Sequence, residues 1–292
     1  MDDLRYVSVR ANGLDFRVAE AGTGARLALL LHGFPECAYS WRHQIPVLAE
    51  LGYRVWAPDL RGYGGSSRPA GAAAYALPQL EADVSGLIEA SGATEVLLVG
   101  HDWGAAIAWS YAMFGKRPIA RLIIMNVPHP ELMRRGLRTF RQLKKSWYIF
   151  FFQLPWLPER LLARNHCAPI AAAFKDMAVD KTRFPREVLS VYREQAAAPG
   201  ALTAMLNYYR ALMRSFNDLK ARGIRKIEVP TLMIWGEEDS ALGKELTYGT
   251  DAYVSDLTIQ YLPRVSHWVQ QEAPEKVNAI MTAWLTGEAL PS

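Results

Sequence analysis

The 292-residue sequence predicts one α/β domain, with a mostly parallel central sheet, helices on both faces and an inserted helical lid. The first observation is that short apolar runs alternate with helix-like segments, which is typical of a parallel sheet covered on both faces. The second is a break in this pattern after Pro130, where basic and aromatic residues gather in helix-like stretches. We therefore assign residues 1–129 and 216–292 to the α/β core and residues 130–215 to the lid.

The individual core elements follow from the spacing of apolar residues and from turn residues. Asn12-Gly13 is a strong signal for a tight turn between two strands. Strands are predicted at 6–10, 14–19, 27–31, 53–57, 95–99, 122–125, 231–235 and 257–262. Helices are predicted at 79–90, 105–114 and 275–285.

Composition and charge restrict the class of protein. Half of the residues are hydrophobic, which is ample for a packed core and argues against disorder. The net charge is +4, but the lid has 15 Lys/Arg against 6 Asp/Glu, whereas the rest of the chain has 18 against 23. A solvated basic surface is the simpler interpretation of the lid, and an anionic membrane or an acidic partner is the alternative.

Several classes of function find no support in the sequence. Cys37 and Cys167 give neither a disulfide framework nor a metal-binding spacing. No stretch is suited to span a bilayer, so we expect no stable membrane insertion, and no nucleic-acid motif is present. The first residues, Met1 to Arg5, lack a signal-peptide pattern, which predicts a cytoplasmic location. The oligomeric state stays open.

The most informative motif is Gly-x-Asp-x-Gly, formed by Gly100, Asp102 and Gly104. It stands between a predicted strand and a predicted helix, the context of a nucleophile elbow, in which a strained turn presents one side chain. The usual nucleophile there is serine. An aspartate is already ionised at neutral pH and needs no base to become a nucleophile. It suits attack on an electrophilic saturated carbon, which points to an epoxide or an alkyl halide and to an alkyl-ester intermediate.

Hydrolysis of such an ester needs a base that activates water, and a histidine oriented by an acid is the usual solution. His267 follows the last predicted strand and is the best placed of the six histidines. Three acids, Glu237, Glu238 and Asp239, follow the strand at 231–235, and spacing alone leaves the choice among them open.

Two further requirements narrow the search for site residues. Ester hydrolysis needs an oxyanion hole, for which the backbone N–H groups of Trp103 and Phe34 are the candidates. Epoxide opening also needs an acid for the departing oxygen, and a tyrosine phenol can act in this way. Composition does not discriminate among the four tyrosines of the lid, which are Tyr148, Tyr192, Tyr208 and Tyr209.

Taken together, these motifs resemble the epoxide hydrolase branch of the α/β-hydrolase fold superfamily. The matching segments are HGFPE (32–36), SWR (40–42), APDLRGYG (57–64), GHDWGA (100–105), GEEDS (236–240) and SHWVQQEAP (266–274). The resemblance implies Asp102 as nucleophile, Asp239 with His267 as the base, and Tyr148 and Tyr209 as the acid pair. It also implies that no metal or organic cofactor is needed.

The expected substrate is a hydrophobic or aryl epoxide, with water as the second reactant. The lid is rich in Phe and Trp, which favours an apolar tunnel wall, although core packing explains the same composition equally well. The residues that we expect to contact the substrate are His32, Pro35, Trp103, Phe152, Tyr208 and Trp268.

Two other functions compete with epoxide hydrolysis. Haloalkane and haloacid dehalogenases use the same aspartate nucleophile, and Trp103 could bind a halide. However, the former typically have Asn where Phe34 stands, and fluoroacetate-type enzymes place arginines after the nucleophile, where this chain has Trp103, Ala105 and Ala106. A non-catalytic ligand-binding protein of the same fold is the third possibility, and the intact set of reactive residues argues against it.

Overall fold

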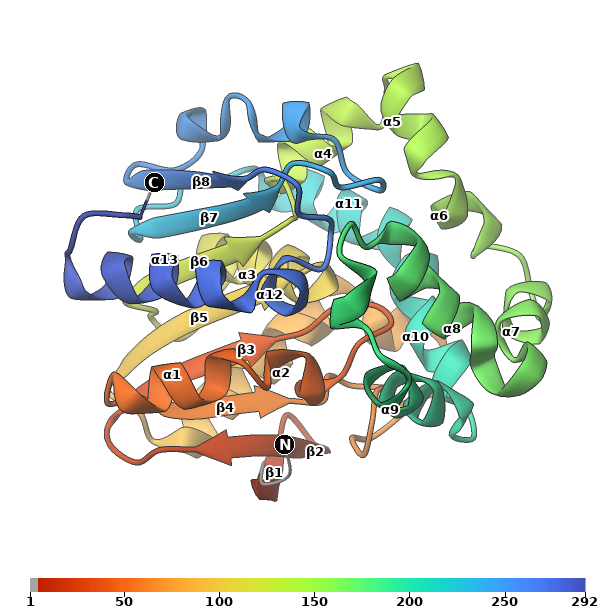
Figure 1. Ribbon diagram of the computed structural model, residues 1–292, viewed down its shortest axis with the longest axis horizontal. Coiled ribbons are helices and arrows are strands. Elements are labelled where there is room, and N and C mark those ends of the chain that lie inside the picture. The colour runs from red at the N-terminus through yellow and green to blue at the C-terminus, as the bar shows by residue number, and fades with distance from the viewer. Residues whose placement is uncertain (1–4, 292) are drawn as a thin grey trace.

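The structure is a computed structural model that describes residues 5–291. Figure 1 shows a central sheet with helices on both sides and a further group of helices beside one end of it. Residues 1–4, in which the sequence has no signal-peptide pattern, lie outside the described range, as does Ser292.

Eight strands form one sheet in the order β1-β2-β4-β3-β5-β6-β7-β8. They are β1 Arg5–Ala11, β2 Leu14–Ala21, β3 Arg26–Leu31, β4 Arg54–Pro58, β5 Glu95–His101, β6 Arg121–Met125, β7 Thr231–Gly236 and β8 Leu257–Leu262. β2 pairs antiparallel with β1 and with β4, and every other pairing is parallel. All eight predicted strands are present, and the prediction of a mostly parallel sheet is confirmed.

The central strands are buried on both faces, which explains their continuous apolar sequences. Alternate side chains point to two separate hydrophobic cores, because successive residues of a strand face opposite sides of the sheet. Leu29 and Leu98 belong to one core, and Leu30 and Val99 belong to the other. All four are completely buried.

Helices cover both faces of the sheet (Figure 1). α2 (Leu77–Ser91) and α3 (Trp103–Phe114) pack on one core, and α1 (Gln44–Glu50) and α13 (Pro274–Thr286) pack on the other. The three predicted helices are confirmed to within two residues at each end. The sequence did not predict α1, because a helix of seven residues is too short for its apolar spacing to be recognised.

The regular secondary structure of the segment between β6 and β7 is helical. Its α-helices are α4 Pro130–Gly136, α5 Phe140–Lys145, α6 Trp147–Phe151, α7 Leu157–Leu162, α8 Arg164–Met177, α9 Arg186–Ala197, α10 Ala201–Arg210 and α11 Leu212–Arg222. The lid boundary expected at residue 215 falls inside α11, so the helical elements continue beyond it to Arg222. Among residues 5–291, no helix has both the length and the apolar character that crossing a bilayer requires.

Candidate active site

Asp102 lies at the turn between β5 and α3. Its backbone has φ 48° and ψ −123°, an unfavourable conformation for a residue with a Cβ, which the surrounding packing must hold in place. Glycines allow this packing. A Cβ on Gly104 would lie 2.0 Å from the carbonyl oxygen of Leu31, and a Cβ on Gly33 would lie 2.2 Å from the Cβ of Asp102. The Gly-x-Asp-x-Gly segment thus forms the strained strand–turn–helix that its sequence predicts.

The carboxylate of Asp102 faces His267, which lies on the loop between β8 and α12 (Val269–Glu272). Oδ2 of Asp102 lies 3.6 Å from Nε2 of His267. On the other side of the ring, Nδ1 of His267 lies 2.7 Å from Oδ2 of Asp239. The imidazole therefore stands between two carboxylates, and the contact with Asp239 orients Nε2 toward Asp102.

Asp239 is the acid that the fold selects from the three that follow β7. Its Oδ1 accepts hydrogen bonds from the backbone N–H groups of Ala241 and Leu242 at 2.8 and 2.9 Å. Its Oδ2 also accepts one from Nδ2 of Asn126 at 2.8 Å. The two competing acids point elsewhere, since Glu238 is exposed and Glu237 pairs with Lys244. Sequence reasoning missed Asn126. The feature of the sequence that could have identified it is its position directly after the β6 strand.

Opposite charges outweigh burial in setting the pKa values of these three groups. Burial lowers the pKa of His267, but Asp239 and Asp102 raise it more, to about 10 from the usual 6.5. Burial raises the pKa values of Asp102 and Asp239, but His267 holds both below the usual 3.8. At neutral pH the group is an imidazolium between two carboxylates.

The predicted oxyanion donors lie beside the nucleophile. The N–H of Phe34, on the loop after β3, donates to Oδ1 of Asp102 at 2.7 Å. Trp103 is the first residue of α3, so its N–H has no acceptor within the helix. One carboxylate oxygen of Asp102 therefore lies at the backbone N–H of Phe34, while the other faces His267.

A second buried carboxylate ties the loops of the site together. Glu36 accepts hydrogen bonds from Gly33 N–H at 3.0 Å and from the amide of Gln271 at 2.7 Å, and its Oε2 lies 2.8 Å from Nδ1 of His101. Nε2 of His101 lies 2.8 Å from the carbonyl oxygen of His267. Both ring nitrogens of His101 thus lie within hydrogen-bond distance of an oxygen atom. Sequence reasoning missed this network, because its members come from three separate segments.

Two tyrosines from the lid stand over Asp102. Tyr148 belongs to α6 and Tyr209 to α10, and their ring centroids are 5.9 Å apart. Burial, and then the charge of Asp102, raise the pKa values of both phenols well above 10. Both side chains therefore keep their protons throughout the neutral and moderately basic range and are available as hydrogen-bond donors.

Two cavities meet at Asp102, Tyr148 and Tyr209. The larger has a volume of about 600 Å³ and also reaches His267, and its walls include Phe34, Pro35, Phe152 and Trp268. The smaller, of about 100 Å³, has Trp103 in its wall and is lined mostly by apolar side chains. Pro35, Phe152, Trp268 and Trp103, four of the six residues that we expect to contact the substrate, thus line these cavities.

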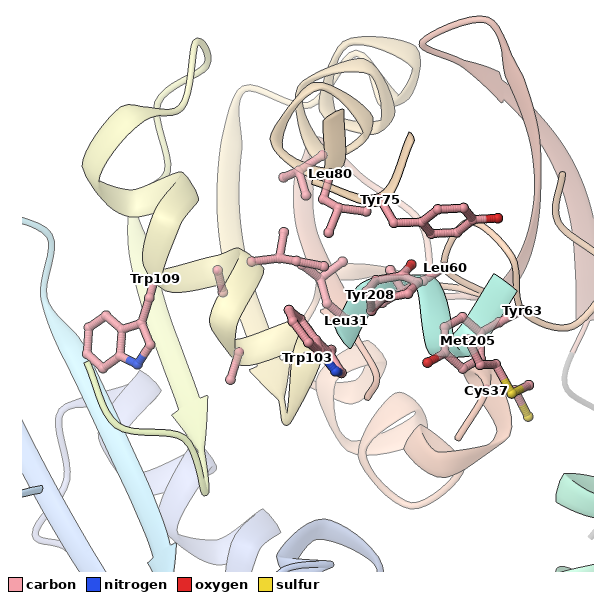
Figure 2. Close-up of a cluster of buried hydrophobic side chains, with 14 of the residues drawn as sticks. Leu31, Cys37, Leu60, Tyr63, Tyr75, Leu80, Trp103, Trp109, Met205 and Tyr208 are labelled. Carbon is pink, nitrogen blue, oxygen red and sulfur yellow. The ribbon is translucent and has the colours of Figure 1, made fainter. Parts of the chain in front are cut away.

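Two residues of the expected substrate-binding set lie elsewhere, and neither lines either of these cavities. His32 is completely buried, and its Nε2 accepts a hydrogen bond from the backbone N–H of Leu60 at 3.0 Å. Tyr208 is a core residue whose hydroxyl donates to the carbonyl oxygen of Arg61 at 2.8 Å. Figure 2 shows it among the rings of Trp103, Tyr63 and Tyr75. Neighbours on a helix point in different directions, so Tyr209 faces the cavities and Tyr208 faces the core.

Comparison with known proteins agrees with this geometry. The family model for the alpha/beta hydrolase fold matches residues 29–274. The chain is 38% identical to the AB hydrolase superfamily protein YfhM of Bacillus subtilis, over 99% of this chain and 100% of that protein. It is also 38% identical to Epoxide hydrolase 4 of Mus musculus, over 97% of this chain and 79% of that protein.

A solved structure extends the likeness to three dimensions. The inhibitor complex of the Bacillus megaterium epoxide hydrolase superposes with a TM-score of 0.87 at 31% identity, over 97% of this chain and all of that one. The chain therefore belongs to the epoxide hydrolase family of the α/β-hydrolase fold superfamily.

Proposed function

We propose that this protein hydrolyses an apolar epoxide to a vicinal diol through an ester on Asp102. One observation carries the proposal. One oxygen of the Asp102 carboxylate accepts a hydrogen bond from the Phe34 N–H, and the other faces His267. Asp102 and the two lid tyrosines, Tyr148 and Tyr209, line both cavities where these meet. This arrangement supplies a nucleophile, an oxyanion site, a base and acids around a single point.

In the first step, Oδ2 of Asp102 attacks one carbon of the epoxide, and the bond from that carbon to the ring oxygen breaks. Tyr148 and Tyr209 donate hydrogen bonds to the departing oxygen, and one of the two phenols transfers its proton. Because the pKa values of both phenols are raised, neither phenol gives up its proton readily. The transfer therefore needs hydrogen bonds from both tyrosines to the departing oxygen.

In the second step, His267 accepts a proton from water, and the resulting hydroxide attacks the Asp102 carboxyl carbon. The charge develops on Oδ1, where the N–H groups of Phe34 and Trp103 stabilise it. As this intermediate collapses, the bond from the carboxyl carbon to the diol oxygen breaks and that oxygen takes the remaining proton of the attacking water, which releases the diol and restores the Asp102 carboxylate beside an imidazolium. The ring is neutral at the start of this step because esterification has removed one of the two charges that raise the pKa of His267, so the pKa falls and the imidazolium gives its proton to the phenolate left by the first step.

The cavities support a hydrophobic or aryl epoxide as the substrate class. Aromatic and aliphatic side chains form most of both walls, and the larger volume lies within the range of ordinary small-molecule sites. Water is the second reactant. A cytoplasmic location and the absence of nucleic-acid partners stay predictions of the sequence.

A single-turnover experiment with styrene oxide in oxygen-18 water tests this proposal. With enzyme in excess, the first diol should carry two unlabelled oxygens, one from the epoxide and one from Asp102, and the label should enter the protein carboxylate. A labelled first diol would exclude the ester route. If no diol forms, epoxide hydrolysis fails for this substrate, and halide release from bromoalkanes then measures the dehalogenase alternative.

A further inference from the structure

The lid has an exposed apolar face that the proposed reaction does not use. Its members, here called the apolar face, are Phe140, Trp147, Phe150, Leu154 and Trp156, with exposed fractions of 84, 62, 58, 44 and 61%. They lie on α5, on α6 and on the turn before α7, which Figure 1 shows in succession along the outer edge of the helical region. Large exposed apolar patches on a protein surface mark sites of interaction.

The sequence around this face is basic. Residues 132–158 contain six Lys/Arg and no Asp/Glu, although the preceding residue, Glu131, pairs with Arg134 and Arg135. Arg138 and Lys144 are exposed and have no ion pair within the described part of the chain. Arg141 is also largely exposed, although it pairs with Glu245 at 3.1 Å. Exposed Trp and Phe side chains among Lys and Arg are typical of segments that lie in the headgroup region of an anionic bilayer.

The apolar face also adjoins the opening of the larger cavity. Trp147 and Lys144 are exposed and at the same time line that cavity, which ends at Asp102 and His267. A lipid surface in contact with the face would therefore lie beside the entrance to the site. An apolar molecule dissolved in the bilayer would reach the cavity without crossing water.

We propose that α5, α6 and the turn before α7 dock on an anionic lipid surface, with the apolar face among the headgroups and the basic side chains on lipid phosphates. A second copy of the chain is the competing occupant. In a symmetric dimer the same patch meets itself, which would bring the exposed charges of Arg138 and Lys144 of one subunit toward those of the other. An anionic bilayer avoids this repulsion. The contact is peripheral, so it is compatible with a protein that does not span the membrane.

Sedimentation of the full chain with vesicles, without any substrate, tests the proposal. We expect binding to an equal mixture of phosphatidylcholine and phosphatidylglycerol, much weaker binding to phosphatidylcholine alone, and release in about 1 M salt, where the Debye length falls to about 3 Å. Arg138→Gln should lower the partition coefficient about fivefold, and Phe140→Ser or Phe150→Ser should each lower it about tenfold. None of these three side chains lines either cavity, so hydrolysis of a water-soluble epoxide should not change.

Matched controls come from the rest of the surface. Met213→Ser removes an exposed apolar side chain of α11, and Lys276→Gln removes an exposed charge on α13, and both variants should bind vesicles as the wild type does. Equal binding to both lipid mixtures, no binding at all, or equal losses in the control variants would overturn the proposal. The proposal would also be overturned if the wild type were a dimer and Phe140→Ser and Phe150→Ser made it monomeric, since the apolar face would then be a protein interface. Each of these outcomes is independent of whether the protein turns over an epoxide.

Discussion

At the scale of single residues, the chemistry depends on a carboxylate where a hydroxyl is usual, and on how that carboxylate acts on His267. While Asp239 and Asp102 are both charged, His267 is held as an imidazolium, and once Asp102 is esterified, only Asp239 still raises the pKa of the ring. The two steps therefore have different pH requirements. Esterification needs ionised Asp102, whose pKa lies below 3.8, whereas ester hydrolysis needs neutral His267 and slows as pH falls.

His267→Gln should accumulate the Asp102 ester and lower turnover by about 10²- to 10⁴-fold, because no other group takes the proton from water. Intact-protein mass spectrometry after mixing with styrene oxide measures the ester as a mass increase equal to one substrate. The double variant Tyr148→Phe/Tyr209→Phe is the matched comparison, since it should stop before the ester forms and show no added mass. Wild-type turnover in His267→Gln would remove His267 from the role of base.

Sequence reasoning located residues well where the signal was local. Asp102 stood out because a strand, a glycine-flanked turn and a helix follow one another along the chain, and the structure has all three elements there. The contacts of Asn126 and Glu36 could not be predicted in this way. They depend on which strands are neighbours and on loops that meet only in the folded sheet. The pairing of Tyr148 with Tyr209 came from resemblance, because a lone helix does not reveal which side chain faces the cavity.

At the scale of elements, the β5–α3 turn is the most constrained part of the fold. The N-terminus of α3 lies against the end of β3, and Gly104 is the point of closest approach. Alanine is the better helix former by about 1 kcal/mol, so helix propensity alone would favour it at this position. The close approach of the Leu31 carbonyl nevertheless disfavours alanine at this position, because a backbone atom cannot rotate away from a new Cβ.

Gly104→Ala should therefore destabilise the protein by about 3 kcal/mol or more and displace Asp102, with a large loss of activity. Urea unfolding together with an activity assay measures both effects. Gly71→Ala is the control, because Gly71 has a φ of 80° but a Cβ at this position would have no neighbour within 4 Å. It should cost about 1–2 kcal/mol of backbone strain and leave activity unchanged. Equal losses in the two variants would show that the close approach at α3 does not matter.

At the scale of the whole molecule, buried ionisable groups couple the fold to pH in two opposite directions. The pKa values of Glu36, Asp102 and Asp239 are lowered in the folded protein, so their stabilising contributions are present above about pH 4 and are lost as pH falls through the folded values. His32 and His129 act in the same direction, because burial lowers their pKa values below 6.5 and the unfolded chain binds their protons more tightly. His267 acts in the opposite direction.

The raised pKa of His267 stabilises the fold below pH 6.5, and this contribution is lost as pH rises toward about 10. The free energy of unfolding should therefore peak near pH 6.5 and fall above it, with a slope of at most about 1.4 kcal/mol per pH unit for one proton. Urea denaturation between pH 5 and 9 measures this curve. His267→Gln should remove the decline between pH 6.5 and 8, a range that lies below the ordinary pKa values of the tyrosines and cysteines. If the wild type and the variant lose stability in parallel over this range, the imidazolium between the two carboxylates does not stabilise the resting protein, and His267 is neutral before the reaction begins.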